Sequence, residues 1–278
     1  MGIKTTSITD LQDKILEIAI YLNKFCEKYD ITYYLMGGTA LGAIRHKGFI
    51  PWDDDFDVFM TYDNYNRFIK VCRKNLDKGR FYLQEENTNE WPMFFTKLRM
   101  NGTTFIEADT KKRNMHKGIY IDIMCLNNVS SNYIYRYIQY LCARLITAET
   151  LNKRGYITNN KKKKISMYLA KIFIKGFVKK ILIKFVRNLN DNETEYVGHF
   201  FGRAKFPYTS FLKKYLGKPR FVKFSNIFLP VPNQVEKYLS VRYGKDFMKI
   251  PSEEIKNEYP VHAELVDLNK NYTYYSKS

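Results

Sequence analysis

Hydrophobic positions in the first part of the chain predict a helix, a strand and a second helix in close succession. Apolar residues over 9–29 recur every three or four positions, which is typical of an amphipathic helix with one buried stripe. Thr9 and Gln12 have the spacing of a capping box at its start. Residues 31–36 are β-branched and aromatic and end at a Gly-Gly pair, which predicts a strand entering a tight turn. A short helix over 39–45 should follow.

The pattern then changes to a run of strands, and later to helices. We expect strands over 56–60, 81–84, 93–100, 103–106, 118–126, 221–224 and 227–229, and helices over 63–76 and 233–243. Residues 131–190 read as helical, and the residues after 244 read as a polar loop. This order indicates an α+β fold. We expect a catalytic core over 1–130, a basic helical insertion over 131–190, and strands and a helix over 191–278 that complete the catalytic domain.

The net charge of +18 over 278 residues suggests a polyanionic partner, and its location narrows the choice. Residues 151–190 contain twelve Lys or Arg and no Asp or Glu, with apolar residues between them. This favours a basic amphipathic segment on an anionic membrane surface. A solvated lysine face on an ordinary packed helix is the plainer alternative. No nucleic-acid-binding module is recognisable, so specific nucleic-acid binding is not expected.

The cysteines and the termini indicate a cytoplasmic protein. The four cysteines show no Cys-x-x-Cys spacing, so reduced thiols are expected rather than a zinc site or a disulfide framework. The N-terminal residues are amphipathic and carry acids, unlike a signal peptide. The sequence contains no stretch of about 18 uninterrupted apolar residues, so no transmembrane helix is expected. We therefore expect a cytoplasmic protein that lies peripherally on the inner face of the membrane.

Carboxylates supply the main candidate chemistry. Asp53, Asp54, Asp55 and Asp57 crowd into five positions, and such a cluster is unfavourable unless it is solvated or binds cations. Residues two apart on a strand point the same way, so Asp55 and Asp57 can serve one site. Asp122 lies within an apolar strand run and can complete that site if the two strands are neighbours. Mg²⁺ is commonly held by one or two carboxylates and substrate phosphates, so Mg²⁺ is the expected cofactor, with Mn²⁺ as the alternative.

A glycine-rich turn precedes these carboxylates. Backbone N–H groups between a strand and a helix can hold a phosphate, and basic residues follow at the other end of the short helix. Each feature alone is usually structural, but the order of strand, Gly-Gly turn, helix, Asp-x-Asp and later strand Asp matches the nucleotidyltransferase plan. The expected fold is therefore a nucleotidyltransferase-type mixed β-sheet flanked by helices. The candidate phosphate-binding residues are Gly37, Gly38, Thr39, Arg45, His46 and Lys47.

The run MGGTALGAIRHKGFIPWDDDFDVFM at 36–60 closely resembles the signature of the LicD family, whose members are phosphotransferases similar to the fukutin group. Further matches are HKGIYIDIMCLNNV at 116–129, YLSVRYGKDFMKIP at 238–251 and His262. One departure is Met-Cys-Leu-Asn at 124–127, where relatives often have Phe-Pro-Leu-Asp, and it concerns the acceptor side of the site.

The resemblance implies transfer of phosphocholine, or a related phospho-alcohol, from a CDP-linked donor to a sugar hydroxyl. CDP-choline is the favoured donor. The acceptor would be a lipid-linked or soluble cell-surface glycan, such as a teichoic acid, lipopolysaccharide or capsule precursor. Alternatives are transfer of glycerol phosphate or ribitol phosphate, a nucleotidyltransferase that uses a nucleoside triphosphate and releases pyrophosphate, and a nucleic-acid-binding protein with a decayed site.

In the expected mechanism, Asp55 and Asp57 hold Mg²⁺ against the donor diphosphate. Asp122 accepts the proton of the acceptor hydroxyl or binds a second metal. Lys97 and Arg99, on the expected strand over 93–100, would stabilise the leaving CMP together with the basic residues after the Gly-Gly turn.

Other residues are weaker candidates. Asp53 and Asp54 could tune the field of the site, bind a second cation or recognise a cationic head group. Trp52, Tyr33 and Tyr34 could contact a quaternary ammonium through cation–π interactions, although ordinary core packing is the more frequent role of such residues. The role of His262 stays open.

Overall fold

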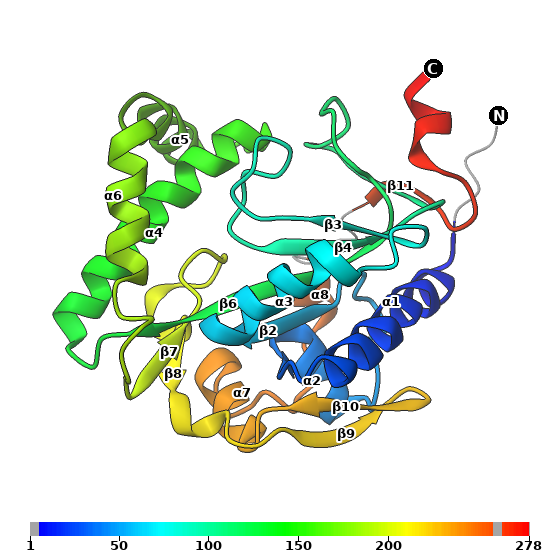
Figure 1. Cartoon of the computed structure of the whole chain (residues 1–278), viewed down its shortest axis with the longest axis horizontal. Coiled ribbons are helices and arrows are strands. Elements are labelled where there is room, and N and C mark those ends of the chain that lie inside the picture. Colours follow the sequence, from blue (N-terminus) through cyan, green and yellow to red (C-terminus); the bar gives the residue numbers. More distant parts are fainter. Residues whose placement is uncertain (1–5, 258–262, 278) are drawn as a thin grey trace.

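A curled, mixed β-sheet lies at the centre of the computed structural model, and helices flank it (Figure 1). The structure describes residues 6–257 and 263–277. The main sheet has the strand order β1-β2-β6-β4-β3, and β6 also pairs with β7, which pairs with β8. Its strands are β1 (Tyr34–Leu35), β2 (Asp57–Thr61), β3 (Phe81–Gln84), β4 (Thr96–Met100), β6 (Tyr120–Val129), β7 (Tyr196–Gly198) and β8 (Ser210–Leu212). Only β2 and β6 are parallel neighbours, and the other pairs are antiparallel.

Two small antiparallel pairs and the helices complete the described chain. The pairs are β9 (Arg220–Phe224) with β10 (Ile227–Val231), and β5 (Thr104–Glu107) with β11 (Ala263–Asp267). The α-helices are α1 (Ile8–Lys28), α2 (Gly37–Arg45), α3 (Tyr62–Asn75), α4 (Tyr133–Arg154), α5 (Lys161–Phe173), α6 (Gly176–Arg187), α7 (Val235–Tyr243) and α8 (Glu253–Asn257). Short 3₁₀ helices span Phe206–Tyr208, Lys213–Tyr215 and Tyr272–Lys277.

The two faces of the sheet have different characters. Helices α1 and α3 pack on one face, where the hydroxyls of Tyr65 on α3 and Thr96 on β4 lie 2.6 Å apart. Because side chains alternate along a strand, the neighbours of Thr96 point to the opposite face. That opposite face carries Asp57, Asp122 and Lys97, so the sheet itself separates the apolar core from the polar site.

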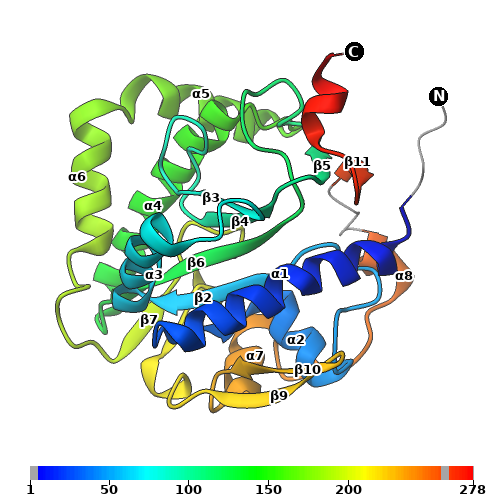
Figure 2. The same cartoon turned by 45° about the vertical axis from the view of Figure 1, so that its right-hand side comes forward.

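Helices α4, α5 and α6 form a lobe at the periphery of the molecule (Figures 1 and 2). Its small core combines residues of α4 and α6 with residues of the sheet and its loops: Phe94, Val129, Ala143, Ile146, Val186, Phe200 and Phe201. The buried Lys179 of α6 forms an ion pair with Glu149 of α4 at 2.8 Å. The lobe is therefore packed on the domain.

Most expected elements are present, with four corrections. The strand expected over 31–36 is paired only at β1, and the polar loop expected after 244 contains α8 and β11. Strands β7 and β8 were not expected. The N-cap of α1 is Ser7, whose side chain accepts a hydrogen bond from the backbone N–H of Asp10, so the capping box predicted from Thr9 is wrong.

Two further observations concern the cysteines and the length of the helices. All four cysteines are free thiols, as expected. Within residues 6–257 and 263–277, no helix has both the length and the apolar character that crossing a membrane requires.

Candidate active site

Three charged side chains form a row across the centre of the sheet. Asp57, the first residue of β2, is the register partner of Asp122 on the parallel strand β6. Asp122 is in turn the partner of Lys97 on the antiparallel strand β4. Register partners point to the same face of a sheet. The strands of Asp57 and Asp122 are therefore neighbours, which was the condition for Asp122 to join the site.

Lys97 is buried beside Asp122. Its side chain is 2% exposed, and Nζ lies 2.8 Å from Oδ1 of Asp122. The same Nζ lies 3.1 Å from the centroid of the Tyr120 ring, and the rings of Trp91 and Phe95 also face it. Burial lowers the pKa of Lys97 to about 8, although Asp122 acts in the opposite direction. The lysine is thus placed to hold the Asp122 carboxylate, and phosphate binding by Lys97 stays a prediction.

The N-terminus of α2 closes over the carboxylates. A Cβ on Gly37 would lie 3.0 Å from Oδ2 of Asp57, and a Cβ on Gly38 would lie 2.9 Å from Oδ2 of Asp53. Gly37 also has a φ of +61°, which side chains rarely tolerate. The hydroxyl of Thr39 accepts a hydrogen bond of 2.7 Å from the backbone N–H of Asp57. The glycine pair therefore lets the backbone of the turn approach the carboxylates closely.

The carboxylates crowd one another. Burial raises the pKa of Asp57 well above its ordinary value, and Asp55, Asp122 and Asp53 raise it further. Lys97 acts in the opposite direction. Like charges at this range repel, and a cation would relieve the repulsion. The arrangement is thus suited to binding a positively charged group.

These residues fit a hard divalent cation that takes part of its coordination shell from the substrate. No group of three or more His, Cys, Asp and Glu side chains in the described part of the chain is arranged to hold a metal by itself. Mg²⁺ does not need such a cage, because it usually keeps waters and binds substrate phosphates beside one or two carboxylates. Asp57 with Asp55 could provide those carboxylates, and the site would be completed by the donor.

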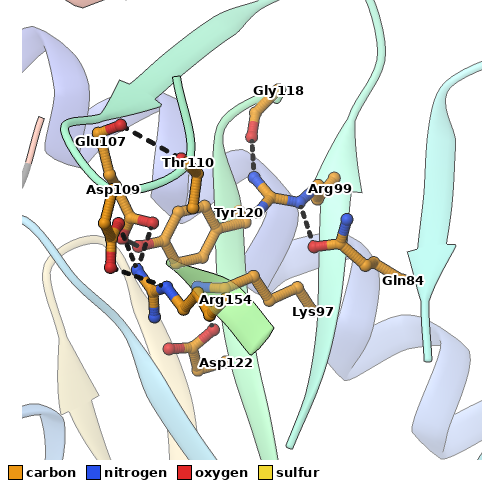
Figure 3. Close-up of polar contacts among 10 residues, drawn as sticks. All are labelled: Gln84, Lys97, Arg99, Glu107, Asp109, Thr110, Gly118, Tyr120, Asp122 and Arg154. Atoms are coloured by element: carbon orange, nitrogen blue, oxygen red, sulfur yellow. Dashed lines mark hydrogen bonds and ion pairs between the residues drawn. The ribbon is translucent and has the colours of Figure 1, made fainter. Parts of the chain in front are cut away.

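A buried ion-pair network continues from Lys97 away from Asp122 (Figure 3). Glu107 at the end of β5 accepts hydrogen bonds from the Tyr120 hydroxyl at 3.0 Å and from Arg154 at 2.7 Å. Arg154, from the C-terminal end of α4, also binds Asp109, with Nε 3.0 Å from Oδ2. Burial alone would raise the pKa of Glu107, but Lys97, Arg154 and Arg99 outweigh it and lower that pKa to about 2. Glu107 is therefore ionised and balances the cations behind the site.

Arg99 lies next to this network and is 1% exposed. Its guanidinium donates hydrogen bonds to Oε1 of Gln84 at 2.8 Å and to the carbonyl of Gly118 at 2.7 Å (Figure 3). These partners give Arg99 a structural role between β3, β4 and β6. Its predicted contact with the leaving CMP has no support in this arrangement.

The basic residues after α2 lie away from the carboxylates. Helix α2 has nine residues, so Arg45 is about 12 Å along the axis from Gly37. Arg45 donates to the carbonyls of Phe247 and Lys249, both at 3.1 Å. The structure therefore does not bring Arg45, or the adjacent His46 and Lys47, together with the glycine turn, and phosphate binding by these three stays a prediction.

The aromatic candidates divide into two groups. Tyr33 and Tyr34 are each 4% exposed, and their hydroxyls donate to Asn23 and to the carbonyl of Gly217, so both are core residues. Trp52 is partly exposed, and Nζ of Lys256 lies 4.5 Å from the centroid of its ring.

The remaining candidates lie at the edge of the site or beyond the described chain. Asp54 is 3% exposed and Asp53 is partly exposed. Asn127, in the run that departs from the family pattern, accepts a hydrogen bond of 3.0 Å from Asn190. His262 lies outside the described residues.

The roles of four residues near the site were not predicted from the sequence. Gln12 on α1 donates to the carbonyls of Ile50 and Asp53, at 3.0 and 2.8 Å, and so holds the loop that carries the aspartates. Tyr238 on α7 accepts a hydrogen bond of 2.9 Å from the backbone N–H of Gly37. Tyr238 lies in the run at 238–251 that resembles the LicD family, and this resemblance could have marked it as a candidate site residue. The sequence contains no comparable signal for Glu107 and Arg154, because their pairing depends on how distant elements pack.

The segment that carries the site is similar in sequence to a domain of known proteins. Residues 30–140 match the family model described as the nucleotidyltransferase domain of LicD/FKTN/FKRP. This range includes the glycine turn and all the aspartates of the site. The chain is 28% identical over 266 residues to the lipopolysaccharide cholinephosphotransferase LicD of Haemophilus influenzae, covering 94% of this chain and 98% of that protein. A shorter similarity, 41% identity over 44 residues, relates it to an uncharacterized protein of Rickettsia typhi and covers 16% of this chain and 14% of that protein. The domain match and the nearly full-length similarity together support a LicD family phosphotransferase.

Proposed function

We propose that the protein transfers phosphocholine, or a related phospho-alcohol, from a CDP-linked donor to a hydroxyl of a cell-surface glycan precursor and releases CMP. The observation that carries this proposal is the row of Asp57, Asp122 and Lys97, closed by the glycine turn at the start of α2. The relative from Haemophilus influenzae, named a lipopolysaccharide cholinephosphotransferase, supports the transferred group and the class of acceptor. We also propose a nucleotidyltransferase-type fold, in line with the name of the matching domain family.

The reaction requires a crowded anionic centre to accept a phosphate-bearing donor. Asp55 and Asp57 are the residues that would hold Mg²⁺, and burial together with the neighbouring carboxylates raises the pKa of Asp57. When bound, Mg²⁺ supplies charge neutralisation on the phosphoryl group and on the leaving phosphate. Backbone N–H groups of Gly38 and Thr39, at the start of α2, would bind phosphate oxygens.

The transfer step can be written on the residues of the chain. The acceptor hydroxyl oxygen forms a bond to the phosphorus of the phosphocholine group, and the bond from that phosphorus to the CMP oxygen breaks. CMP leaves with the electron pair, and the proton of the hydroxyl passes to Asp122. Lys97 keeps the Asp122 carboxylate in place through its ion pair at 2.8 Å. Positioning of this kind supplies much of the catalysis in phosphoryl transfer.

The test is donor turnover, followed by ³¹P NMR. Purified protein with Mg²⁺ and a glycan acceptor is incubated separately with CDP-choline, CDP-glycerol, CDP-ribitol and CTP. Release of CMP from CDP-choline is the expected result. Release of CMP only from CDP-glycerol or CDP-ribitol would show that glycerol phosphate or ribitol phosphate is the transferred group. Release of pyrophosphate from CTP, with no turnover of any CDP donor, would overturn the proposal in favour of a nucleotidyltransferase.

Asp57→Asn separates catalysis from folding. Loss of a principal electrostatic group should lower turnover by about 10³-fold. The same variant should be at least as stable as the wild type, because it removes one charge from a repelling cluster. The matched control is Asp13→Asn on the exposed side of α1, which should keep wild-type turnover. Near-normal turnover of Asp57→Asn would remove this residue from the site.

A further inference from the structure

The peripheral helix α5 presents an apolar stripe to solvent. Ile165, Leu169 and Ile172 are all exposed and follow the i, i+4, i+7 spacing of one helix face. The buried residues of α5 are Met167 and Ala170, which lie on the opposite side of the helix. The larger apolar side chains of α5 therefore face away from the protein, which reverses the usual arrangement of a surface helix.

The neighbouring helices of the lobe also expose large apolar side chains. On α4 the exposed apolar residues again follow helical spacing, and on α6 they lie one turn apart. The exposed fraction is 69% for Ile134 and 77% for Phe177. These residues are Ile134, Ile138, Leu141 and Leu145 on α4, and Phe177 and Ile181 on α6.

A groove of about 400 Å³ lies where α4 meets α5, and apolar side chains line most of it. Leu145 comes from α4, and Ile165, Leu169 and Phe173 come from α5. Contiguous exposed apolar surface of this kind marks an interaction site. We call the outward side of α4, α5 and α6 the lobe face.

Lysines surround the apolar stripe. Lys164 and Lys171, seven residues apart, lie about a quarter turn to one side of the stripe on α5, and Lys162 lies on the other side. On α6, Lys180 and Lys184 are exposed beside Phe177 and Ile181. Long lysine side chains can lie along apolar surface while their ammonium groups reach a charged boundary.

The charge of the lobe face has one sign. Residues 151–190 contain no Asp or Glu, and four of their twelve cations pair with acids elsewhere in the protein. These are Lys153, Arg154, Lys179 and Arg187, at 2.7 to 2.9 Å. The exposed lysines of α5 and α6 can therefore interact electrostatically with a binding partner of the lobe face.

We propose that the lobe face docks on a bilayer surface that contains anionic phospholipid. The apolar side chains lie at the level of the head groups, and the surrounding lysines contact lipid phosphates. A second copy of the chain fits poorly, because like-charged lysines would face each other. Nucleic acid fits less well, because nine of the fourteen large apolar side chains exposed on α4, α5 and α6 are aliphatic and cannot stack with bases. This proposal goes beyond the reaction and does not depend on the identity of the donor.

The experiment is co-sedimentation of the full chain with large vesicles. Vesicles of phosphatidylglycerol mixed with phosphatidylcholine should bind the protein, and vesicles of phosphatidylcholine alone should bind it far more weakly. Each lysine near the surface contributes roughly a fivefold change in partitioning, so Lys164→Glu with Lys171→Glu should weaken binding by roughly 25-fold or more. Ile165→Ser with Ile172→Ser should weaken it independently of charge.

The matched control lies on the β9–β10 hairpin, where Lys223 and Phe228 are register partners and both are exposed. Lys223→Glu with Phe228→Ser changes the same kinds of side chain and should leave vesicle binding unchanged. Equal binding to both vesicle types, or equal loss in this control, would overturn the proposal. A soluble dimer in light scattering that Ile165→Ser with Ile172→Ser dissociates, together with no vesicle binding, would assign the lobe face to a second copy instead.

A direct measurement of depth does not rely on loss of binding. Phe177→Trp places an indole on the lobe face, and the fluorescence of the wild type gives the background of Trp52 and Trp91. Lipids brominated on the acyl chain should quench the added tryptophan. Quenching no greater than that of the wild type in vesicle-bound protein would contradict insertion of α6.

Discussion

Glu107→Gln tests the ion-pair network behind the candidate site. Glu107 has a pKa of about 2 in the folded protein, against an ordinary value of 4.5. Because each pH unit is worth somewhat more than 1 kcal/mol, the lowered pKa corresponds to about 3 kcal/mol of folding free energy at neutral pH. Glutamine keeps the shape of the side chain but removes the charge that Lys97, Arg154 and Arg99 stabilise. We therefore expect Glu107→Gln to lower the free energy of unfolding by about 3 kcal/mol at pH 7.

The pH dependence of this effect has a definite sign. The folded pKa lies below the unfolded one, so the unfolded state takes up the proton first as the pH falls. The contribution of Glu107 is complete above about pH 5 and is lost as the pH falls from about 4.5 through about 2. The gap between wild type and Glu107→Gln should therefore shrink to about 1 kcal/mol at pH 3.

Urea unfolding at pH 7 and pH 3, followed by circular dichroism, measures both quantities. The matched control is Glu264→Gln on the neighbouring strand β11, where Glu264 forms a 3.7 Å surface pair with Lys111. That variant should change the free energy of unfolding by less than about 1 kcal/mol. A gap for Glu107→Gln below about 1 kcal/mol at pH 7, or a gap that does not shrink at pH 3, would refute the reasoning.

Two further substitutions test the packing that positions the site and the lobe. Gly42→Ala should destabilise the protein by about 2 kcal/mol, because the new Cβ would lie 2.5 Å from the carbonyl oxygen of Gly48. Thermal unfolding measures this effect, with Gly79→Ala in a loop as the control. Equal unfolding midpoints of the two variants would contradict the prediction. Glu149→Gln should destabilise the lobe by about 3 kcal/mol, because it leaves Lys179 buried without its 2.8 Å partner. Hydrogen exchange in α6 should then accelerate, and unchanged protection there would contradict the role of this pair.

The strongly patterned elements were predictable from the sequence. The stripe of α1 and the apolar run of β6 are local signals, and the boundaries of these elements differ from the expected ones by only a few residues. Strand β11 was missed because Ala263–Asp267 has no strong pattern of its own and exists as a strand by pairing with β5. The same reason explains the three-residue strands β7 and β8, which are stabilised by β6 and by each other.

The candidate site shows the same division. Asp55, Asp57, Asp122 and the glycine pair could be selected from residue type and order. Lys97 and Arg99 were selected as residues that stabilise the leaving CMP, but the sequence pattern of β4 cannot show which side chains pack over the strand. Trp91, Tyr120 and Arg154 lie there, and they turn Lys97 into a buried partner of Asp122.

Residue identity, order and charge are local properties of the chain, so the sequence alone indicated the family, the carboxylate cluster and the basic character of 151–190. Which of these charges act together depends on the fold. The register of β2, β6 and β4 brought Asp57, Asp122 and Lys97 into one row. The packing of α4 buried Arg154 against Glu107, and the packing of α5 left its apolar stripe facing outward. Strand pairing and helix packing join residues far apart in the chain, and the strength of an ion pair depends on the burial that this packing creates.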